Sequence, residues 1–152
     1  MGQQQHLEQA LLRGVLATTA DTALATLAAI TPENFQFPQH QTIAKAIYAR
    51  AQALSDAQAG TAHIDPAVVM ADLVDSGATD TVRTAMIEVS TGNPAAPAEL
   101  PRLTQALQIA TLRAEMLTTG QALTTAADGS LTDVQTALQH AADLTRLATD
   151  II

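Results

Sequence analysis

The chain has 152 residues, and its composition excludes several classes of protein. It carries 15 acidic against 7 basic residues, a net charge of −8, and it has no cysteine. Disulfide frameworks and thiolate metal sites are therefore excluded. The few basic residues are scattered, and Phe35, Phe37 and Tyr48 are its aromatic side chains, which leaves little to neutralise phosphates or to stack on bases. We therefore expect no direct binding of nucleic acid.

No apolar run approaches the roughly 20 residues that a membrane-spanning helix needs. The N-terminus, Met-Gly-Gln-Gln-Gln-His, has neither the basic region nor the apolar core of a signal peptide. These two observations predict a cytoplasmic protein that does not associate with membranes.

The predicted elements are helices throughout. Apolar residues recur at helical spacing in five successive stretches, which cover residues 7–16, 22–30, 38–54, 66–76 and 80–89. Between the second and third stretches, Pro32 is expected to open a single turn. Asp65 and Pro66 form a start signal, because Asp can cap free amides and Pro suits the first helical position. Gly77 is expected to end the fourth helix in a left-handed conformation.

The last third of the chain is predicted to form a hairpin of two long helices after a loop at residues 92–97. The first helix carries apolar residues at spacings of 3, 4, 3, 4 and 3, namely Leu100, Leu103, Leu107, Ala110, Ala114 and Leu117, as in a long packed helix. Asp128 and Gly129 should end it. Ser130 and Asp133 resemble a capping box at the start of the final helix, with Asp in place of the usual Glu.

No segment is predicted to be a strand, so the fold class is all-α. We expect a compact bundle of about five helices over residues 1–98, followed by a long antiparallel helical hairpin over residues 99–152 that packs on it as one unit. The hairpin has more apolar residues than one helix–helix contact can bury. They either close the core of the single chain or form an interface between chains, and the two interpretations are compatible.

Catalytic motifs are missing from the sequence. It has no GxxxxGK[ST] phosphate loop, HExxH, GxSxG, CxxC or GxGxxG motif. The four histidines are far apart, and His40, at a predicted helix start, is expected to pack or hydrogen-bond rather than to act as a base. Asp72 and Asp75 are interpreted as solvated surface charges. We therefore expect no catalytic residue, no metal site, no cofactor and no enzyme activity from this chain.

Several segments resemble, in order, the N-terminal domain of DnaB-type replicative helicases. Residues 7–16, LEQALLRGVL, are similar to the family's opening helix, and residues 30–35, ITPENF, to its "LxPEDF". Residues 38–43, PQHQTI, resemble its "xxHxxIF", and residues 64–69, IDPAVV, its "PIDxxTL". Residues 73–77 fit the "LxxxG" that follows, and residues 90–97 stand at its "NxPSAAN" loop.

The resemblance implies a helical scaffold for ring assembly in DNA replication. In that family the hairpin pairs subunits, three dimers build a ring on a separate ATP-dependent motor, and the ring recruits primase or loader proteins. By analogy, self-association is expected through the hairpin, as a homodimer or a trimer of dimers, and a primase C-terminal domain or a helicase loader is the expected partner. The residues expected at the self-association surface are Leu107, Met116, Leu117, Val134 and Leu138.

Two other functions remain open at this point. The chain could be a stand-alone regulator that binds a full-length helicase. It could also be an unrelated helical protein that binds a ligand near Phe35, His40 and Tyr48, which a deep polar pocket with His40 beside a carboxylate would favour.

Overall fold

A computed structural model describes residues 2–94 and 96–151, with the side chain of Glu33 left out. The described residues form seven α-helices and no strand, so the predicted all-α fold class is confirmed. Two short 3₁₀ turns, η1 (Pro32–Asn34) and η2 (Pro97–Glu99), precede α3 and α6. None of the described helices is both long enough and apolar enough to cross a lipid bilayer.

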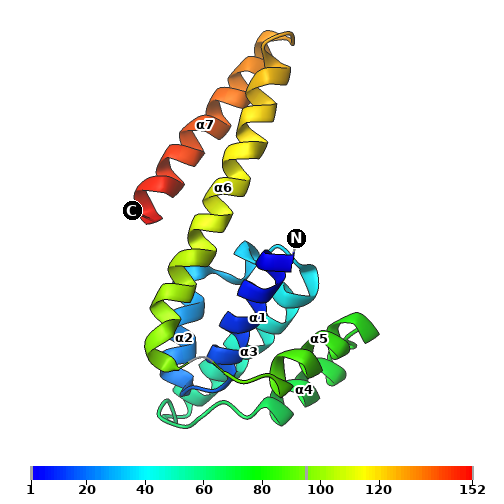
Figure 1. Cartoon of the computed structure of the whole chain (residues 1–152), viewed down its shortest axis with the longest axis vertical. Helices are drawn as coiled ribbons and strands as arrows, with labels where there is room; N and C mark the ends of the chain where they lie inside the picture. Colours follow the sequence, from blue (N-terminus) through cyan, green and yellow to red (C-terminus); the bar gives the residue numbers. More distant parts are fainter. Residues whose placement is uncertain (1, 95, 152) are drawn as a thin grey trace. The chain divides into compact units, whose positions relative to one another are not determined.

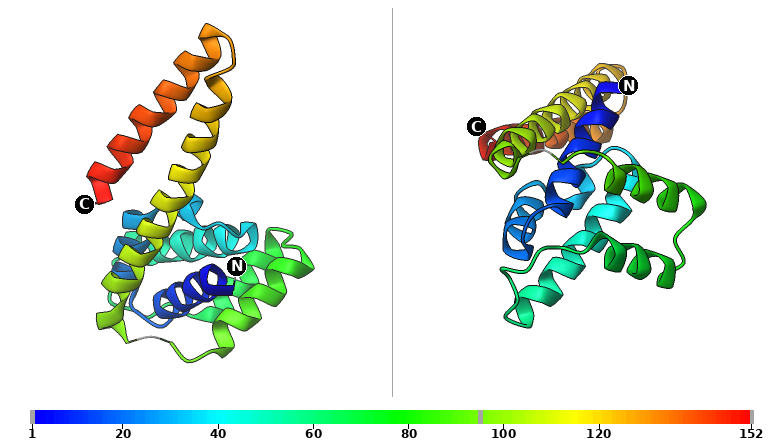
Figure 2. Two further views of the ribbon diagram at one scale, coloured as in Figure 1. Left: turned by 45° about the horizontal axis from the view of Figure 1, so that its top comes forward. Right: turned by 60° about the horizontal axis from the view of Figure 1, so that its bottom comes forward.

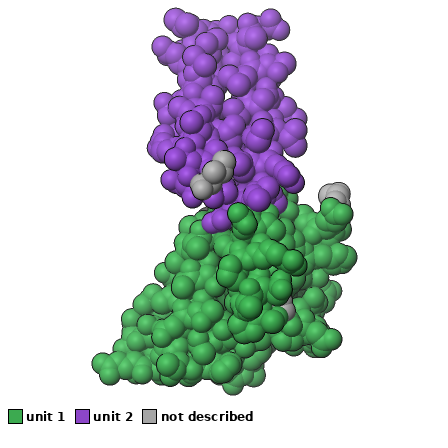
Figure 3. Space-filling model, turned by 60° about the vertical axis from the view of Figure 1, so that its left-hand side comes forward, with its two compact units in different colours: residues 1–107 green, residues 108–152 purple. Residues whose placement is uncertain are grey.

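The chain divides into two compact units, residues 1–107 and residues 108–152, shown in separate colours in Figure 3. The division falls inside a helix, whereas the predicted one lies before that helix, between residues 98 and 99. The predicted domains, including their packing as one unit, stay a prediction.

The first unit contains five helices and the start of a sixth. The five are α1 (Gly2–Leu16), α2 (Ala20–Ile30), α3 (Pro38–Asp56), α4 (Pro66–Asp75) and α5 (Asp80–Thr91). α3 is the central helix, because α1, α2, α4 and α5 all contact it, and Figures 1 and 2 show it passing between them. Its Ile43, Ile47 and Ala51 are fully buried, and Leu54 packs against the same core.

The helix ends follow the predicted signals. The Asp65 carboxylate accepts from the backbone N–H of Ala67 at 2.9 Å, Pro66 occupies the first turn of α4, and Pro32 opens η1. Gly77 follows α4 with a φ of +82°, where a residue without a Cβ is favoured. The loop predicted at residues 92–97 is present, although its Ala95 lies outside the described residues.

The second unit is an antiparallel helical hairpin. It contains α6 (Leu100–Ala126) from residue 108 onward and α7 (Leu131–Ile151). The predicted capping box starts α7, since the Ser130 N–H donates to the Asp133 carboxylate at 3.1 Å and the Asp133 N–H donates to the Ser130 hydroxyl at 3.2 Å.

The packed face predicted for α6 does not extend along the whole helix. Leu100 and Leu107 are buried and Leu103 packs against the core of the first unit, but Leu117 is 70% exposed. The apolar spacing of 3 and 4 residues continues along α6 past residue 107. The core that Leu100, Leu103 and Leu107 join belongs to the first unit and ends there. Periodicity identifies the face of a helix and does not identify what covers it.

Candidate interaction site

A buried carboxylate–histidine pair lies where two of the motifs meet. Glu8 of α1 and His40 of α3 have side chains 0% and 1% exposed, and the Glu8 Oε1 atom lies 2.8 Å from the His40 Nδ1 atom. The Glu8 carboxylate also accepts from the backbone N–H of Gln36 at 2.9 Å and from the Gln4 side-chain amide at 2.7 Å. A longer contact, 3.4 Å, reaches the N–H of Phe37.

The charge state of Glu8 follows from these contacts. Burial raises the pKa of Glu8, but hydrogen bonds from His40, Gln4 and the backbone of Gln36 and Phe37 outweigh burial, and the net pKa is lowered from 4.5. Glu8 is therefore ionised at neutral pH. Because a carboxylate only accepts, this network assigns a hydrogen to Nδ1 of His40.

The role expected for His40 agrees with this geometry. It packs beside Phe37, with 5.4 Å between ring centroids, and it hydrogen-bonds at the start of α3. His40 does meet a carboxylate, yet both side chains are shielded from solvent, so neither is available to a dissolved ligand. The pair ties the turn at residues 35–38 to α1.

Glu8 was not singled out from the sequence, although a signal was present. It lies three and four residues before Leu11 and Leu12, two side chains of the buried face of α1. A carboxylate on that face must have a hydrogen-bonding or charged partner when it is buried. The sequence alone does not identify that partner.

The hairpin exposes large apolar side chains. Of the seven exposed large apolar residues in the part of the chain that the structure describes, five belong to residues 108–152, about a third of the chain. They are Met116 at 55%, Leu117 at 70%, Leu123 at 39%, Leu131 at 75% and Leu138 at 58% exposed. This concentration of exposed apolar side chains makes the hairpin the candidate interaction site.

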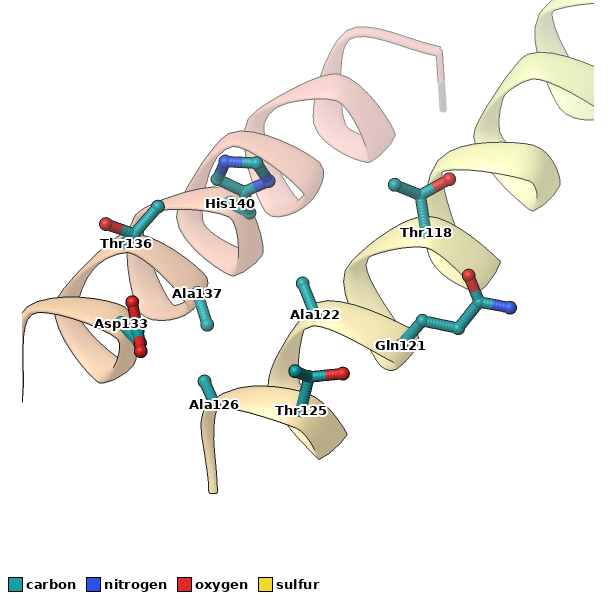
Figure 4. A pocket seen from close by; sticks show the side chains of 9 residues that line it. All are labelled: Thr118, Gln121, Ala122, Thr125, Ala126, Asp133, Thr136, Ala137 and His140. Carbon is teal, nitrogen blue, oxygen red and sulfur yellow. The ribbon is translucent and has the colours of Figure 1, made fainter. Parts of the chain in front are cut away.

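Small side chains fill the contact between α6 and α7. Ala126 and Ala137 are buried, and Figure 4 shows Ala122, Ala126 and Ala137 directed toward one another across the gap. Ala137 is the one buried residue among those described in α7. Burial of a methyl-sized group contributes about 0.8 kcal/mol, so this contact holds α7 far less strongly than a leucine seam would.

A groove lined by small and polar residues lies on one side of this contact. It has a volume of about 450 Å³ and is lined by Thr118, Gln121, Ala122, Thr125, Ala126, Asp133, Thr136, Ala137 and His140. Within the described residues, no group of three or more His, Asp or Glu side chains is placed to hold a metal ion.

The exposed apolar residues other than Leu117 lie on the side of the hairpin opposite to this groove. Thr118 and Thr125 lie to one side of the Ala122–Ala126 line on α6, and positions 116 and 123 lie to the other, as a period of 3.6 residues requires. The same rotation separates Thr136 and His140 from positions 134 and 138 on α7. The two helices of an antiparallel pair are related by a two-fold axis. Positions that are rotated by the same angle about their own helix axes, away from the α6–α7 contact, therefore lie on the same side of the hairpin. We call this side the apolar flank, and it consists of Met116, Leu123, Leu131, Val134 and Leu138.

The five residues predicted at the self-association surface occupy three different places. Met116, Val134 and Leu138 belong to the apolar flank, with Val134 half-buried. Leu117 is exposed on α6 away from α7, where it lines a shallow hollow with Met116 and Gly120. Leu107 is fully buried in the core of the first unit. Their participation in self-association stays a prediction.

Comparison with known proteins identifies the first unit. Residues 1–108 match the family model described as the DnaB-like helicase N terminal domain, and the end of that match falls beside the division between the two units. Neither the curated proteins nor the solved structures gave a match. Because the family model covers more than half of the chain, and the matched residues include Glu8, His40 and their turn, the chain belongs to the DnaB-like helicase N-terminal domain family.

Proposed function

We propose that this chain is the scaffold domain of a replicative helicase-like protein, which self-associates through its hairpin and docks other replication proteins. Family membership supports the helicase role. The observation that carries self-association is the apolar flank, with Met116, Leu131 and Leu138 each more than half exposed.

The assembly is proposed to be a homodimer, or a trimer of such dimers, in the cytoplasm. A primase C-terminal domain or a helicase loader is the proposed partner of the assembled layer. ATP hydrolysis is assigned to a separate motor domain, since the match covers the N-terminal domain and the sequence has no phosphate loop.

Direct DNA binding is not part of this proposal. Among the described residues, Arg50, Arg83, Arg102 and Arg146 pair with carboxylates. The Arg50 guanidinium donates three hydrogen bonds to the Asp72 carboxylate, at 2.7, 2.9 and 3.1 Å. A paired arginine in a chain of net charge −8 contributes little to phosphate neutralisation.

The test is light scattering coupled to size-exclusion chromatography, with the Leu138→Asp variant beside the wild type. We expect a wild-type dimer or larger assembly and a monomeric variant, because an unpaired carboxylate in an apolar interface costs several kcal/mol. The matched control is Gln135→Asp, which puts the same charge on an exposed position of α7 that points away from α6. It should leave the assembly intact.

A second arm adds an isolated primase C-terminal domain to the wild-type chain. We expect the primase domain to co-elute with the assembled wild-type protein. If primase binds only the assembled form, less of it should co-elute with the Leu138→Asp variant. A wild-type chain that stays monomeric at high concentration and ignores primase contradicts the scaffold proposal.

A further inference from the structure

α7 packs weakly against α6 for a helix of its length. α7 has 21 residues, and Ala137 is its one buried side chain among those described. Two of its four leucines, Leu131 and Leu138, are exposed, while Val134, Leu144 and Leu147 are half-buried. The groove of about 450 Å³ beside Ala137 adds a hollow in place of a packed contact.

The sequence of α7 does not compensate for this weak packing. Most of the stability of a helix in a protein comes from the packing of its apolar face rather than from intrinsic propensity. α7 includes four threonines and a valine, residues whose branched side chains lose rotamer freedom in a helix. Its capping box at Ser130 and Asp133 secures the first turn and leaves the later turns dependent on side-chain burial.

The charges of α7 are segregated from the apolar flank. Asp143, Arg146 and Asp150 follow one another at spacings of 3 and 4 and so share one side of the helix. The flank positions Leu131, Val134 and Leu138 continue at helical spacing into Ala141 and Thr145, which carry no charge. On α6, the corresponding positions Leu112, Met116 and Leu123 are equally uncharged.

This distribution favours a second copy of the chain as the occupant of the flank. Two chains of net charge −8 repel each other, and an uncharged face lets them approach without placing like charges in contact. A partner recognised by ion pairs would find no charge among the flank residues, with Arg113 of α6 at their edge, whereas an apolar face is complementary to itself in a two-fold dimer.

The side of the hairpin that carries the flank is long enough for the same occupant. About 19 residues of α6 and the 21 of α7 span roughly 30 Å at 1.5 Å per residue, and two helices side by side are roughly 20 Å wide. That whole side therefore offers at most roughly 600 Å², somewhat below the roughly 800 Å² per partner of a standard interface, and the flank residues occupy the half of it next to the turn.

We propose that a second copy, packed against the apolar flank, is what keeps α7 folded on α6, so that ordering of the hairpin is coupled to self-association. This inference rests on the proposed function, because it needs the hairpin to be the interface. In the separated protomer, α7 docks on α6 only transiently. The groove between α6 and α7 exists only while α7 is docked. A partner that binds in this groove therefore binds the assembled form selectively.

The test is hydrogen exchange of the wild-type chain over a dilution series that crosses the dissociation constant measured by light scattering. We expect the protection of α7 amides to fall at least about tenfold on dissociation, in step with the fraction of monomer. Amides of α3, at the centre of the first unit, should keep their protection throughout and serve as the internal control.

Leu138→Asp and Gln135→Asp extend the test at a fixed high concentration. The first should lose protection in α7 alone, and the second should match the wild type. If the wild type dissociates on dilution while its α7 amides stay protected, α6 alone holds α7; this inference is then wrong and the scaffold proposal stands. If the wild type is monomeric at every concentration, both fail.

Discussion

At the scale of single residues, the Glu8 carboxylate connects α1 to the turn before α3. Replacing Glu8 with Gln keeps the size of the side chain but removes the charge that His40, Gln36 and Gln4 bond to. We expect the free energy of unfolding to fall by about 1–3 kcal/mol, as for hydrogen bonds to a buried charged group. Urea unfolding followed by circular dichroism measures the loss.

The matched control for this variant is Asp75→Asn, which removes a carboxylate from an exposed position at the end of α4. Exposed substitutions of this kind change stability by no more than about 0.5 kcal/mol. Equal destabilisation by the two variants would show that net charge, and not the buried network, accounts for the effect.

The same carboxylate predicts a direction for the pH dependence of stability. The pKa of Glu8 in the folded chain is below 4.5, its ordinary value, so its contribution is complete above pH 4.5 and is lost as pH falls through the folded pKa. The difference in urea midpoint between the wild type and Glu8→Gln should be constant from pH 7 to about pH 5 and should shrink below that. A difference that grows toward low pH would mean that burial, which raises the pKa, dominates the folded state.

At the scale of the helices, two glycines make opposite predictions for the same substitution. In α1, a Cβ on Gly14 would lie 2.6 Å from the Cδ2 atom of Leu100, a side chain that is 2% exposed and has little space to move. In α6, a Cβ on Gly120 would meet no atom within 4 Å. Gly14→Ala should therefore destabilise the first unit by about 1–3 kcal/mol through overpacking.

Gly120→Ala should instead stabilise the chain by about 1 kcal/mol, because alanine is the better helix former and the new methyl group has space. Thermal unfolding of the two variants, compared with the wild type at one protein concentration, measures both shifts. A stabilising Gly14→Ala would show that α1 and the start of α6 do not approach as closely as described.

The helix ends were predictable from sequence because local chemistry determines them. Asp65, Gly77 and the pair Ser130 and Asp133 each act within a few residues of the backbone groups that they satisfy. The central position of α3 was not predictable, since its contacts join segments that are distant in the sequence.

The candidate site was predictable in part for the same reason. Periodicity marked Met116, Val134 and Leu138 as apolar positions of one hairpin, and the structure places them on one flank. It could not separate Leu117 from Leu107, which belongs to the same pattern of 3 and 4 on α6 and is fully buried in the first unit. Burial depends on the surface that a helix meets, and a repeat of 3 and 4 continues unchanged where that surface changes.

At the scale of the whole molecule, the net charge of −8 opposes any contact between two copies, while the apolar flank contains no ion pair that salt could weaken. Added salt screens the long-range repulsion, since the screening length falls from roughly 14 Å near 0.05 M to about 4 Å near 0.5 M. Salt also strengthens the burial of apolar surface when its ions are excluded from the protein. Both effects favour association.

We therefore expect the dissociation constant of the wild-type assembly to fall, by about threefold or more, when sodium chloride is raised from about 0.05 to about 0.5 M. Sedimentation equilibrium at each salt concentration measures it. The unfolding free energy of Leu138→Asp in the same solutions separates the effect of salt on the fold from its effect on association. A dissociation constant that rises with salt would require ion pairs across the interface, and Arg146 of α7, which pairs with Asp143, would then be the group to exchange partners between copies.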